Sequence, residues 1–265
     1  MIIAGAGIIG VSLALELRER GANVLVLEKS TPGDESSSAA AGMLAATDPE
    51  TPLPMRSLAA ESARIFPEYV AQLERVSGVE TDFRRNGTIA LLGEAASSPA
   101  GYAKLSADDL HRVEPRLVRH GQQAFFIQED TVDPRLLMRA ALATAERSGV
   151  EIRRHTEVKA IRSAGSHVEV DTAADTLCAI AAVNCRGAWS GAPVKPRKGQ
   201  MLYVRPEGQN LLQHVVHAPD VYIVPRGSGK ILVGATVEDA GFDKIVATAT
   251  IQRLLIAAAK YLPEL

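Results

Sequence analysis

Three glycines near the N-terminus, Gly5, Gly7 and Gly10, have the spacing G-x-G-x-x-G and follow a short apolar run. An Ala/Leu-rich segment, another glycine and a second apolar run that ends in Glu28 come next. This order predicts a strand, a tight turn, a helix and a second strand. The glycines would let the backbone approach a pyrophosphate at the positive end of the helix, and Glu28 could accept hydrogen bonds from ribose hydroxyls. The stretch therefore predicts a dinucleotide site for NAD or FAD, because Glu28 disfavours the 2′-phosphate of NADP.

The composition of the 265 residues is that of an ordinary globular protein, with 46% hydrophobic and 23% charged residues. The net charge of -2 gives no electrostatic reason to expect nucleic acid or an anionic membrane as a partner. The apolar start of the chain lacks a basic n-region and a cleavage site, and it is too short to span a bilayer. The two cysteines fit a reduced compartment, so we expect a cytoplasmic protein. The six histidines lie apart in the sequence, and we expect no metal site.

The elements that must position the dinucleotide site follow one another in an interleaved order. After the βαβ start, the segment 57–76 is expected to be a helix. Its buried face would carry Leu58, Ile65, Val70, Leu73 and Val76. β-rich sequence returns at Val150, and the strands of a second sheet precede a final amphipathic helix. The order predicts an α/β fold in which a Rossmann-like domain is interleaved with a domain built on a mixed or antiparallel sheet.

A second segment that could contact a ligand follows Glu28. It is polar at first and then consists of small and hydroxyl-bearing residues from Ser36 to Met43. Such residues suit a backbone that lies close to a ligand, and they equally suit a flexible loop that enters a helix. The residues by themselves leave both interpretations open.

Seven spaced motifs lie along nearly the whole chain. They are 4–10 (AGAGIIG), 36–43 (SSSAAAGM), 85–88 (RNGT), 187–190 (GAWS), 198–201 (KGQM), 222–226 (YIVPR) and 233–236 (VGAT). Together they resemble the FAD-dependent amine and amino-acid oxidases of the D-amino-acid oxidase superfamily, and within it the glycine oxidases. The resemblance selects FAD over NAD. It implies a glutathione-reductase-type FAD-binding domain made of residues 1–84 and 131–193, and a substrate domain made of residues 85–130 and 194–265.

The resemblance also implies which residues meet each part of FAD. Ile8 and Ile9 would meet the pyrophosphate, and Glu28 and Lys29 would meet the ribose of the adenosine. The backbone of Val158 would touch the adenine, and residues 36–43 would run beside the ribityl chain and the flavin ring. The full set implied for the cofactor is Gly5, Gly7, Ile8, Ile9, Gly10, Glu28, Lys29, Ser36, Ser37, Ala41, Gly42, Met43, Val158 and Gly187.

Tyr222 and Arg226 are the residues expected to meet the substrate. Tyr222 matches a family tyrosine near the substrate pocket, and the alternative is a half-buried strand tyrosine with a satisfied hydroxyl. Arg226 suits a carboxylate by its chemistry, although an arginine at a strand end before Gly227 is more often a solvated surface group. No acid–base pair stands out in the sequence. The reaction implied by the resemblance needs none, because hydride leaves an unprotonated amine for the flavin.

The resemblance implies oxidation of a small amine or amino acid, such as glycine, sarcosine or a D-amino acid, to an imine. O2 would be the electron acceptor and hydrogen peroxide the product. Two other functions stay open: an amine dehydrogenase with a different acceptor, and a catalytically incompetent remnant that binds FAD weakly. Relatives often form tetramers, so a homo-oligomer is a further expectation, which no feature of the sequence tests.

Two features depart from the pattern of the family. Relatives continue past the last helix into a segment with a Trp-x-Gly-Leu-Arg-Pro motif, which would supply a substrate-binding arginine and close the FAD domain. We therefore expect this C-terminal FAD-domain segment to be missing after Leu265. Arg186 stands where relatives have a small residue, so its side chain is expected either to crowd the cofactor or to point to solvent.

Overall fold

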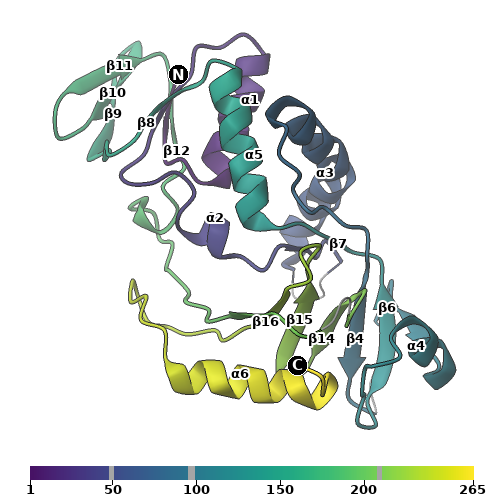
Figure 1. The fold of residues 1–265 in the computed structure, drawn as a ribbon. Coiled ribbons are helices and arrows are strands. Elements are labelled where there is room, and N and C mark those ends of the chain that lie inside the picture. The colour runs from purple at the N-terminus through teal and green to yellow at the C-terminus, as the bar shows by residue number, and fades with distance from the viewer. Residues whose placement is uncertain (48–50, 95–98, 208–210) are drawn as a thin grey trace. The chain divides into compact units, whose positions relative to one another are not determined.

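The computed structural model of the protein describes residues 1–47, 51–94, 99–207 and 211–265 (Figure 1). The chain forms two compact units, each made of three segments. Unit 1 comprises Met1–Ala40, Pro67–Thr81 and Pro134–Lys195, and unit 2 comprises Ala41–Phe66, Asp82–Asp133 and Pro196–Leu265. The predicted α/β class, with a Rossmann-like part interleaved with a sheet-based part, is confirmed. The predicted functional division after residues 84, 130 and 193 stays a prediction.

Unit 1 is built on sheet A, a parallel sheet with the strand order β12-β1-β2-β8. A three-stranded antiparallel sheet with the order β11-β10-β9 belongs to the same unit. The elements of unit 1 are β1 (Ile2–Ala4), α1 (Ile8–Glu19), β2 (Leu25–Leu27), α2 (Ser36–Ala39), α5 (Pro134–Arg147), β8 (Glu151–Arg153), β9 (Ala160–Ala164), β10 (His167–Asp171), β11 (Thr176–Ala179), β12 (Ala182–Asn184) and a 3-10 turn, Gly187–Trp189. Helix α3 (Arg56–Ser77) contains Pro67, where the division between the units falls.

Sheet A is covered by helices on one face and by the small sheet on the other. Helices α1 and α5 lie side by side, and they contact β1 and β8 (Figure 1). The opposite face buries Ile2, Ala4 and Leu27 against Val158 and Val170. Because successive residues of a strand point to opposite faces, a strand covered on both sides is apolar throughout. This explains why the strands of the dinucleotide motif are continuous apolar runs.

Unit 2 is built on sheet C, a seven-stranded sheet with the order β13-β16-β15-β14-β4-β6-β5. Within sheet C, β14 pairs with β4 in parallel, and the other described strand pairs of this sheet are antiparallel. A second, two-stranded antiparallel sheet joins β3 to β7. The elements of unit 2 are β3 (Met43–Leu44), a 3-10 turn (Leu53–Met55), β4 (Thr88–Leu92), β5 (Ala103–Leu105), α4 (Ala107–Val113), β6 (Gln123–Ile127), β7 (Asp130–Thr131), β13 (Leu202–Val204), β14 (Val215–Ala218), β15 (Val221–Pro225), β16 (Ile231–Gly234) and α6 (Thr248–Tyr261).

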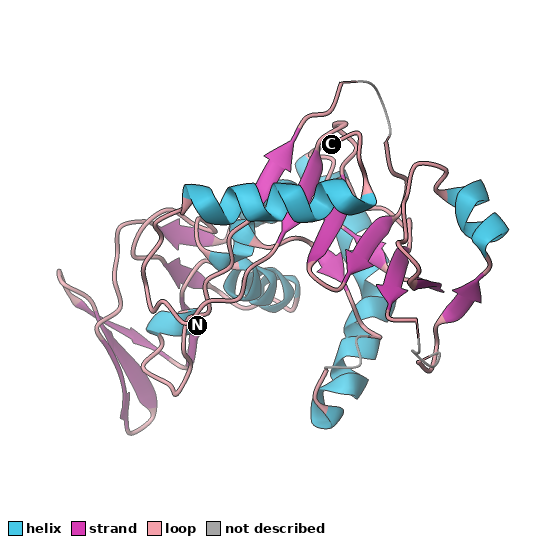
Figure 2. Ribbon diagram, turned by 90° about the horizontal axis from the view of Figure 1, so that it is seen from below, coloured by secondary structure: helices cyan, strands magenta, loops and turns pink. Residues whose placement is uncertain are grey.

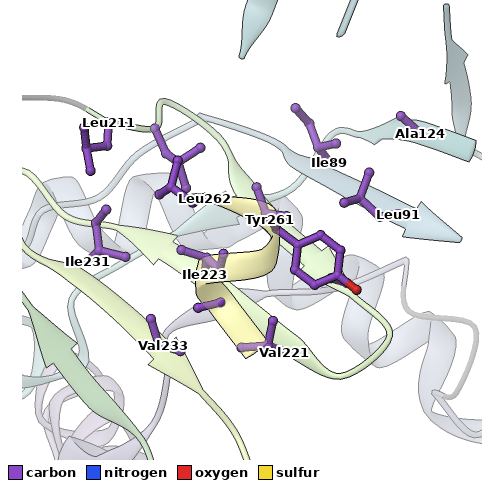
Figure 3. Packing of buried hydrophobic residues seen from close by; sticks show 14 of the residues in the cluster. Ile89, Leu91, Ala124, Leu211, Val221, Ile223, Ile231, Val233, Tyr261 and Leu262 are labelled. Atoms are coloured by element: carbon purple, nitrogen blue, oxygen red, sulfur yellow. The ribbon is translucent and has the colours of Figure 1, made fainter. Parts of the chain in front are cut away.

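Helix α6 covers one face of sheet C (Figure 2). Tyr261, at its last turn, and Leu262 pack with Val221 and Ile223 of β15 (Figure 3). Complete burial of a leucine or isoleucine side chain contributes about 1.5–3 kcal/mol, so this cluster fixes the helix on the face that carries the odd-numbered residues of β15. Tyr222 and the other even-numbered residues of β15 consequently point to the opposite face.

The buried face predicted for the segment 57–76 is wrong in its first half. Val70 and Leu73 are buried, but Leu58 is 60% exposed and Ile65 is 46% exposed. The helix itself forms as predicted. Only its turns after Pro67 pack into unit 1, since apolar spacing indicates which face could be buried and not which turns find a partner.

Candidate dinucleotide site and substrate face

The turn between β1 and α1 depends on two glycines. Gly5 has a φ of 104°, in the left-handed region, and a Cβ there would lie 2.5 Å from the carbonyl oxygen of Cys185. A Cβ at Gly10 would overlap the carbonyl oxygen of Gly5 and lie 3.3 Å from the Cβ of Cys185. The glycines therefore bring the end of β1, the first turn of α1 and the residue after β12 into direct contact, as the spacing predicts.

The N-terminus of α1 lies beside the carboxyl ends of β1 and β12. Gly7 is its N-cap and makes no side-chain capping bond, and Ile8 N donates to Ser37 Oγ at 2.9 Å. The residue Ile9 is 71% exposed. The first amide groups of a helix have no carbonyl partner within the helix, and its dipole favours an anion there. This end of α1 therefore offers donors and positive potential to a phosphate.

Glu28 closes the glycine turn from the neighbouring strand. Its residue is only 8% exposed, and Oε2 accepts a hydrogen bond from Ala6 N at 2.8 Å. Oε1 accepts from Ser30 N at 3.0 Å, and the carbonyl oxygen of Glu28 accepts from Thr156 N at 2.7 Å. Ser30 Oγ also donates to Oε1, at 3.2 Å. Each carboxylate oxygen has two lone pairs, so Oε2 can still accept a ribose hydroxyl. Glu28 thus has a structural role beside the predicted one.

Arg186 extends from the end of β12 to the segment that follows β8. Its Nη1 donates to the carbonyl oxygen of Val158 at 2.8 Å, and its Nη2 donates to the carbonyl oxygen of Ser190 at 3.1 Å. Its Nε donates to Asn184 Oδ1 at 3.0 Å. The expectation that Arg186 points to solvent is therefore wrong. Sequence reasoning missed these bonds, because their acceptors include main-chain oxygens that no residue type reveals.

Further cations gather around the same edge of unit 1. Lys29 Nζ lies 3.3 Å from the centroid of the Trp189 ring, which is a cation–π contact. Trp189 follows Gly187 closely in the chain. The pKa of Glu157 is held below its ordinary value, first by a hydrogen bond from Lys159 and then by the charges of Lys29 and Arg186. Lys29, Lys159 and Arg186 therefore lie near enough to Glu157 to favour its ionised form, and they bring positive charge to the edge where a dinucleotide is expected.

The segment 36–43 has defined structure in both units. In unit 1, Ser36 and Ser37 begin α2. In unit 2, Met43 pairs with Thr131 in the two-stranded sheet, and Val132 N donates to the carbonyl oxygen of Gly42 at 2.9 Å. The segment thus comprises the short helix α2 and the start of β3. Whether residues 36–43 contact a flavin stays a prediction.

Tyr222 lies on the face of sheet C opposite α6. It packs with Met43 and Met201 beside the buried side chains of Val224 and Leu232. Its hydroxyl donates to the sulfur of Met201 at 3.0 Å, and burial raises the pKa of Tyr222 to about 12. The hydroxyl therefore stays protonated near neutral pH, so it can donate a hydrogen bond but cannot act as a base. Met201, in the motif KGQM, is a contact that sequence reasoning had not singled out.

Arg226 is buried, with 4% of the residue exposed. Its Nη1 donates to the carbonyl oxygen of Val132 at 2.9 Å, and its Nη2 donates to the carbonyl oxygen of Ala41. The interpretation of Arg226 as a solvated surface group is therefore wrong. The reason is that β15 ends beneath two segments from elsewhere in unit 2, which cover the strand end that the local sequence suggested was open.

Other kinds of site find no support among the described residues. No group of three or more His, Cys, Asp or Glu side chains is placed there to hold a metal ion. None of the described helices has the length and apolar character needed to cross a membrane. Cys178 and Cys185 are free thiols, and burial raises the pKa of Cys185. The glycine turn on sheet A has the form of the dinucleotide-binding turn of α/β proteins.

Known proteins match the chain along its whole length. Residues 1–265 match the family of FAD dependent oxidoreductases (DAO). The bifunctional protein ThiO/ThiG of Trichormus variabilis is 34% identical over 287 residues, which cover 100% of this chain and 44% of that protein. Glycine oxidase of Bacillus licheniformis is 31% identical over 282 residues, covering 99% of this chain and 76% of the enzyme. The crystal structure of glycine oxidase from Geobacillus kaustophilus has a TM-score of 0.90 at 31% identity, covering 99% of this chain and 77% of that one.

The chain belongs to the family of FAD dependent oxidoreductases. The predicted resemblance is confirmed, and so is the choice of FAD over NAD, since FAD is the cofactor of the family. The chain spans less than half the length of the ThiO/ThiG protein and about three quarters of the length of the glycine oxidases.

Proposed function

We propose that this chain binds FAD at the carboxyl edge of sheet A and oxidises the C–N bond of a small amine or amino acid to an imine. Water would hydrolyse the imine, and O2 would take up the two electrons and two protons as hydrogen peroxide. The observation that carries the proposal is the glycine turn closed by Glu28, in a chain that belongs to the FAD dependent oxidoreductases over its full length. The relatives named glycine oxidase point to glycine or a close analogue as the substrate.

The residues of the dinucleotide site fit FAD in charge and in shape. Beyond Ile8 N, which donates to Ser37 Oγ, the first turn of α1 offers amide groups to a diphosphate, and the glycines remove the side chains that would obstruct it. Oε2 of Glu28 retains a lone pair for a ribose hydroxyl. Lys29 and Arg186 supply positive charge at the same edge. We propose that the predicted cofactor residues of unit 1, including Val158 and Gly187, hold FAD here, and that Ala41, Gly42 and Met43 of unit 2 contact the flavin.

The chemistry that bound FAD would supply is acceptance of a hydride from the carbon next to the amine nitrogen. The task of the chain is then to bind, orient and exclude water. We propose that Tyr222 and Met43 form part of the substrate pocket, because both belong to the half-buried cluster on the face of sheet C that α6 leaves uncovered. Tyr222, protonated at neutral pH, would exchange its hydrogen bond to the sulfur of Met201 for one to the substrate.

A purified sample tests the cofactor and the reaction together. FAD added to the protein should bind with quenching of the flavin fluorescence, and glycine or sarcosine should bleach the bound flavin without air. A protein that binds FAD and is bleached by no small amine would refute the proposed reaction while leaving the cofactor in place. A protein that takes up no FAD would refute both parts.

The electron acceptor needs a separate measurement. Readmission of air to the bleached protein should restore the flavin colour and release one hydrogen peroxide for each amine oxidised. If colour returns only with a quinone or another artificial acceptor, the chain is a dehydrogenase. D-alanine, tested beside glycine and sarcosine, would show whether the pocket accepts a side chain on the carbon that is oxidised.

A further inference from the structure

We propose that Arg226 is a positioning residue, which holds residues 41–43 in place through main-chain hydrogen bonds and does not bind the substrate itself. This inference rests on the proposed function, in which residues 41–43 run beside the flavin. It replaces the role that the chemistry of an arginine suggests when only the sequence is known. All residues that carry it lie in unit 2.

The burial of Arg226 makes its hydrogen bonds decisive. Only 4% of the residue is exposed, and a charged group is costly to bury unless its donors are satisfied. A guanidinium has five N–H donors in a rigid fork. Two of its three nitrogens donate to main-chain carbonyl oxygens, and Nε has no hydrogen-bond partner among the described residues. The two carbonyl bonds are thus the contacts that keep this charge in place.

The two carbonyl groups belong to segments that are far apart in the sequence and adjacent in space. Ala41 and Val132 lie 185 and 94 positions from Arg226. Val132 N also donates to the carbonyl oxygen of Gly42, and Met43 pairs with Thr131. Arg226 therefore ties together both sides of the small β3–β7 sheet. Residues 41–43 are thus held by the strand pairing of Met43, by the bond from Val132 N to Gly42 and by the bond from the guanidinium to Ala41.

The backbone beneath Arg226 is itself fixed. Gly227 N donates to Asp82 Oδ2 at 2.8 Å, and Asp82 Oδ1 accepts from Arg84 Nε at 2.7 Å. Arg84 in turn exchanges two main-chain hydrogen bonds of 2.8 Å with Thr131. The side chain of Arg226 thus extends from a backbone that Asp82 holds, and its guanidinium binds the segment of Thr131 and Val132, which Arg84 holds. A side chain held at both ends suits a brace better than a ligand that must adapt to substrate.

The same strand connects Arg226 to the proposed pocket. Tyr222 and Val224 are alternate residues of β15, so their side chains leave the strand on one face, and Arg226 follows directly after the last residue of this strand. Ala41 and Met43 pack against the cluster that contains Tyr222 and Val224. Loss of the guanidinium would leave the carbonyl groups of Ala41 and Val132 without this donor and would loosen residues 41–43 over Tyr222.

A substrate carboxylate would have to compete for the same donors. Bidentate recognition of a carboxylate uses two parallel N–H groups of the guanidinium. Nη1 and Nη2 already donate to carbonyl oxygens, and their burial leaves little room for an incoming anion. The geometry therefore favours the positioning role, and the two roles predict different measurements.

The test compares Arg226→Met and Arg226→Lys with the wild type and with Arg119→Met. Arg119 is a matched control, because its Nη1 also donates to a main-chain carbonyl, that of Gln122 at 3.1 Å, in the connection between α4 and β6 of unit 2. Hydrogen exchange of the Val132 amide, which donates to Gly42, is measured without FAD. The dissociation constant of FAD, the visible spectrum of the bound flavin, KM and kcat for sarcosine, and inhibition by acetate are measured on the loaded protein.

A positioning residue predicts at least tenfold faster exchange of the Val132 amide in Arg226→Met, FAD binding weakened by about tenfold, and an altered flavin spectrum. Tenfold corresponds to ~1.4 kcal/mol. Arg226→Lys, which keeps a donor, should lie between Arg226→Met and the wild type, and Arg119→Met should match the wild type. Acetate inhibition should change no more than FAD binding does.

Selective loss of sarcosine and acetate binding, with normal amide exchange and normal FAD binding, would show that Arg226 binds the carboxylate and would overturn the inference. Unchanged behaviour in every assay would overturn it as well. If the wild type takes up no FAD, the proposed function fails, and the exchange of the Val132 amide still decides whether Arg226 holds residues 41–43.

Discussion

Replacement of Gly10 by alanine is the most direct test of the glycine turn. Gly10 has an ordinary helical φ, so backbone strain plays no part and the added methyl group is the whole perturbation. That methyl group would overlap the carbonyl oxygen of Gly5 and approach Cys185 to 3.3 Å. Both neighbours are parts of the strand ends on which α1 rests. Helix α1 must therefore move away from β1 and β12, and its N-terminus moves with it.

The expected magnitudes separate stability from cofactor binding. Forcing an extra methyl group into a packed site costs about 1–3 kcal/mol, whereas alanine gains about 1 kcal/mol over glycine within a helix. The net loss of stability is then at most about 2 kcal/mol, which lowers Tm by up to about 8 °C in a protein of this size. A charge-assisted hydrogen bond contributes about 1.5–3 kcal/mol, so misalignment of even one amide with the diphosphate weakens FAD binding about tenfold or more.

Fluorescence titration with FAD and thermal unfolding provide the two measurements. Gly93→Ala is the matched control, because a Cβ at Gly93 would meet nothing within 4 Å. It should leave both quantities unchanged. If Gly10→Ala binds FAD as tightly as the wild type, the close approach of α1 to the strand ends is not what creates the site, and the reasoning fails. If Gly10→Ala loses far more than about 2 kcal/mol of stability, the main role of Gly10 is to stabilise the fold and not to shape the cofactor site.

Substitutions at three other residues, with matched variants, probe the remaining contacts. Glu28→Ala leaves the buried amide of Ala6 without its acceptor, so it should cost about 1–3 kcal/mol of stability in thermal unfolding and should weaken FAD binding. Glu28→Gln keeps an acceptor oxygen and should be more stable than Glu28→Ala. Equal stability of the two variants would contradict this role of Glu28. Arg186→Ala removes three hydrogen bonds and should lower Tm by about 2–4 °C for each kcal/mol lost, while Arg154→Ala, which removes a surface ion pair, should change Tm little. Tyr222→Phe should raise KM several-fold with FAD retained, and unchanged kinetics would remove Tyr222 from the pocket. Because burial raises the folded-state pKa of Tyr222 to about 12, its ionisation in the unfolded chain should reduce wild-type stability as the pH rises from about 10 to 12, and Tyr222→Phe should lose less in that range.

The dinucleotide turn could be predicted because its determinants are local. Gly5, Gly10 and Glu28 belong to one βαβ unit, in which the spacing of the glycines and the position of the carboxylate follow from the geometry of a strand, a turn and a helix. The choice of FAD needed motifs along the whole chain, since the turn treats both dinucleotides alike. The same holds for the α/β class, which the alternation of apolar runs and amphipathic segments indicates without knowledge of any contact.

The partners of Arg226 and Arg186 were decided only by the tertiary structure. Both arginines donate to carbonyl oxygens of residues that are distant in the sequence, and every residue type has such an oxygen. No pattern of side chains therefore reveals these bonds, and the local sequence favoured a solvated surface for Arg226. The exposed first half of α3 has the same origin, because an apolar stripe becomes a core only where another element covers it. Sequence by itself thus determined the cofactor turn and the fold class, while the packing of distant segments decided which charged side chains are buried and what they hold.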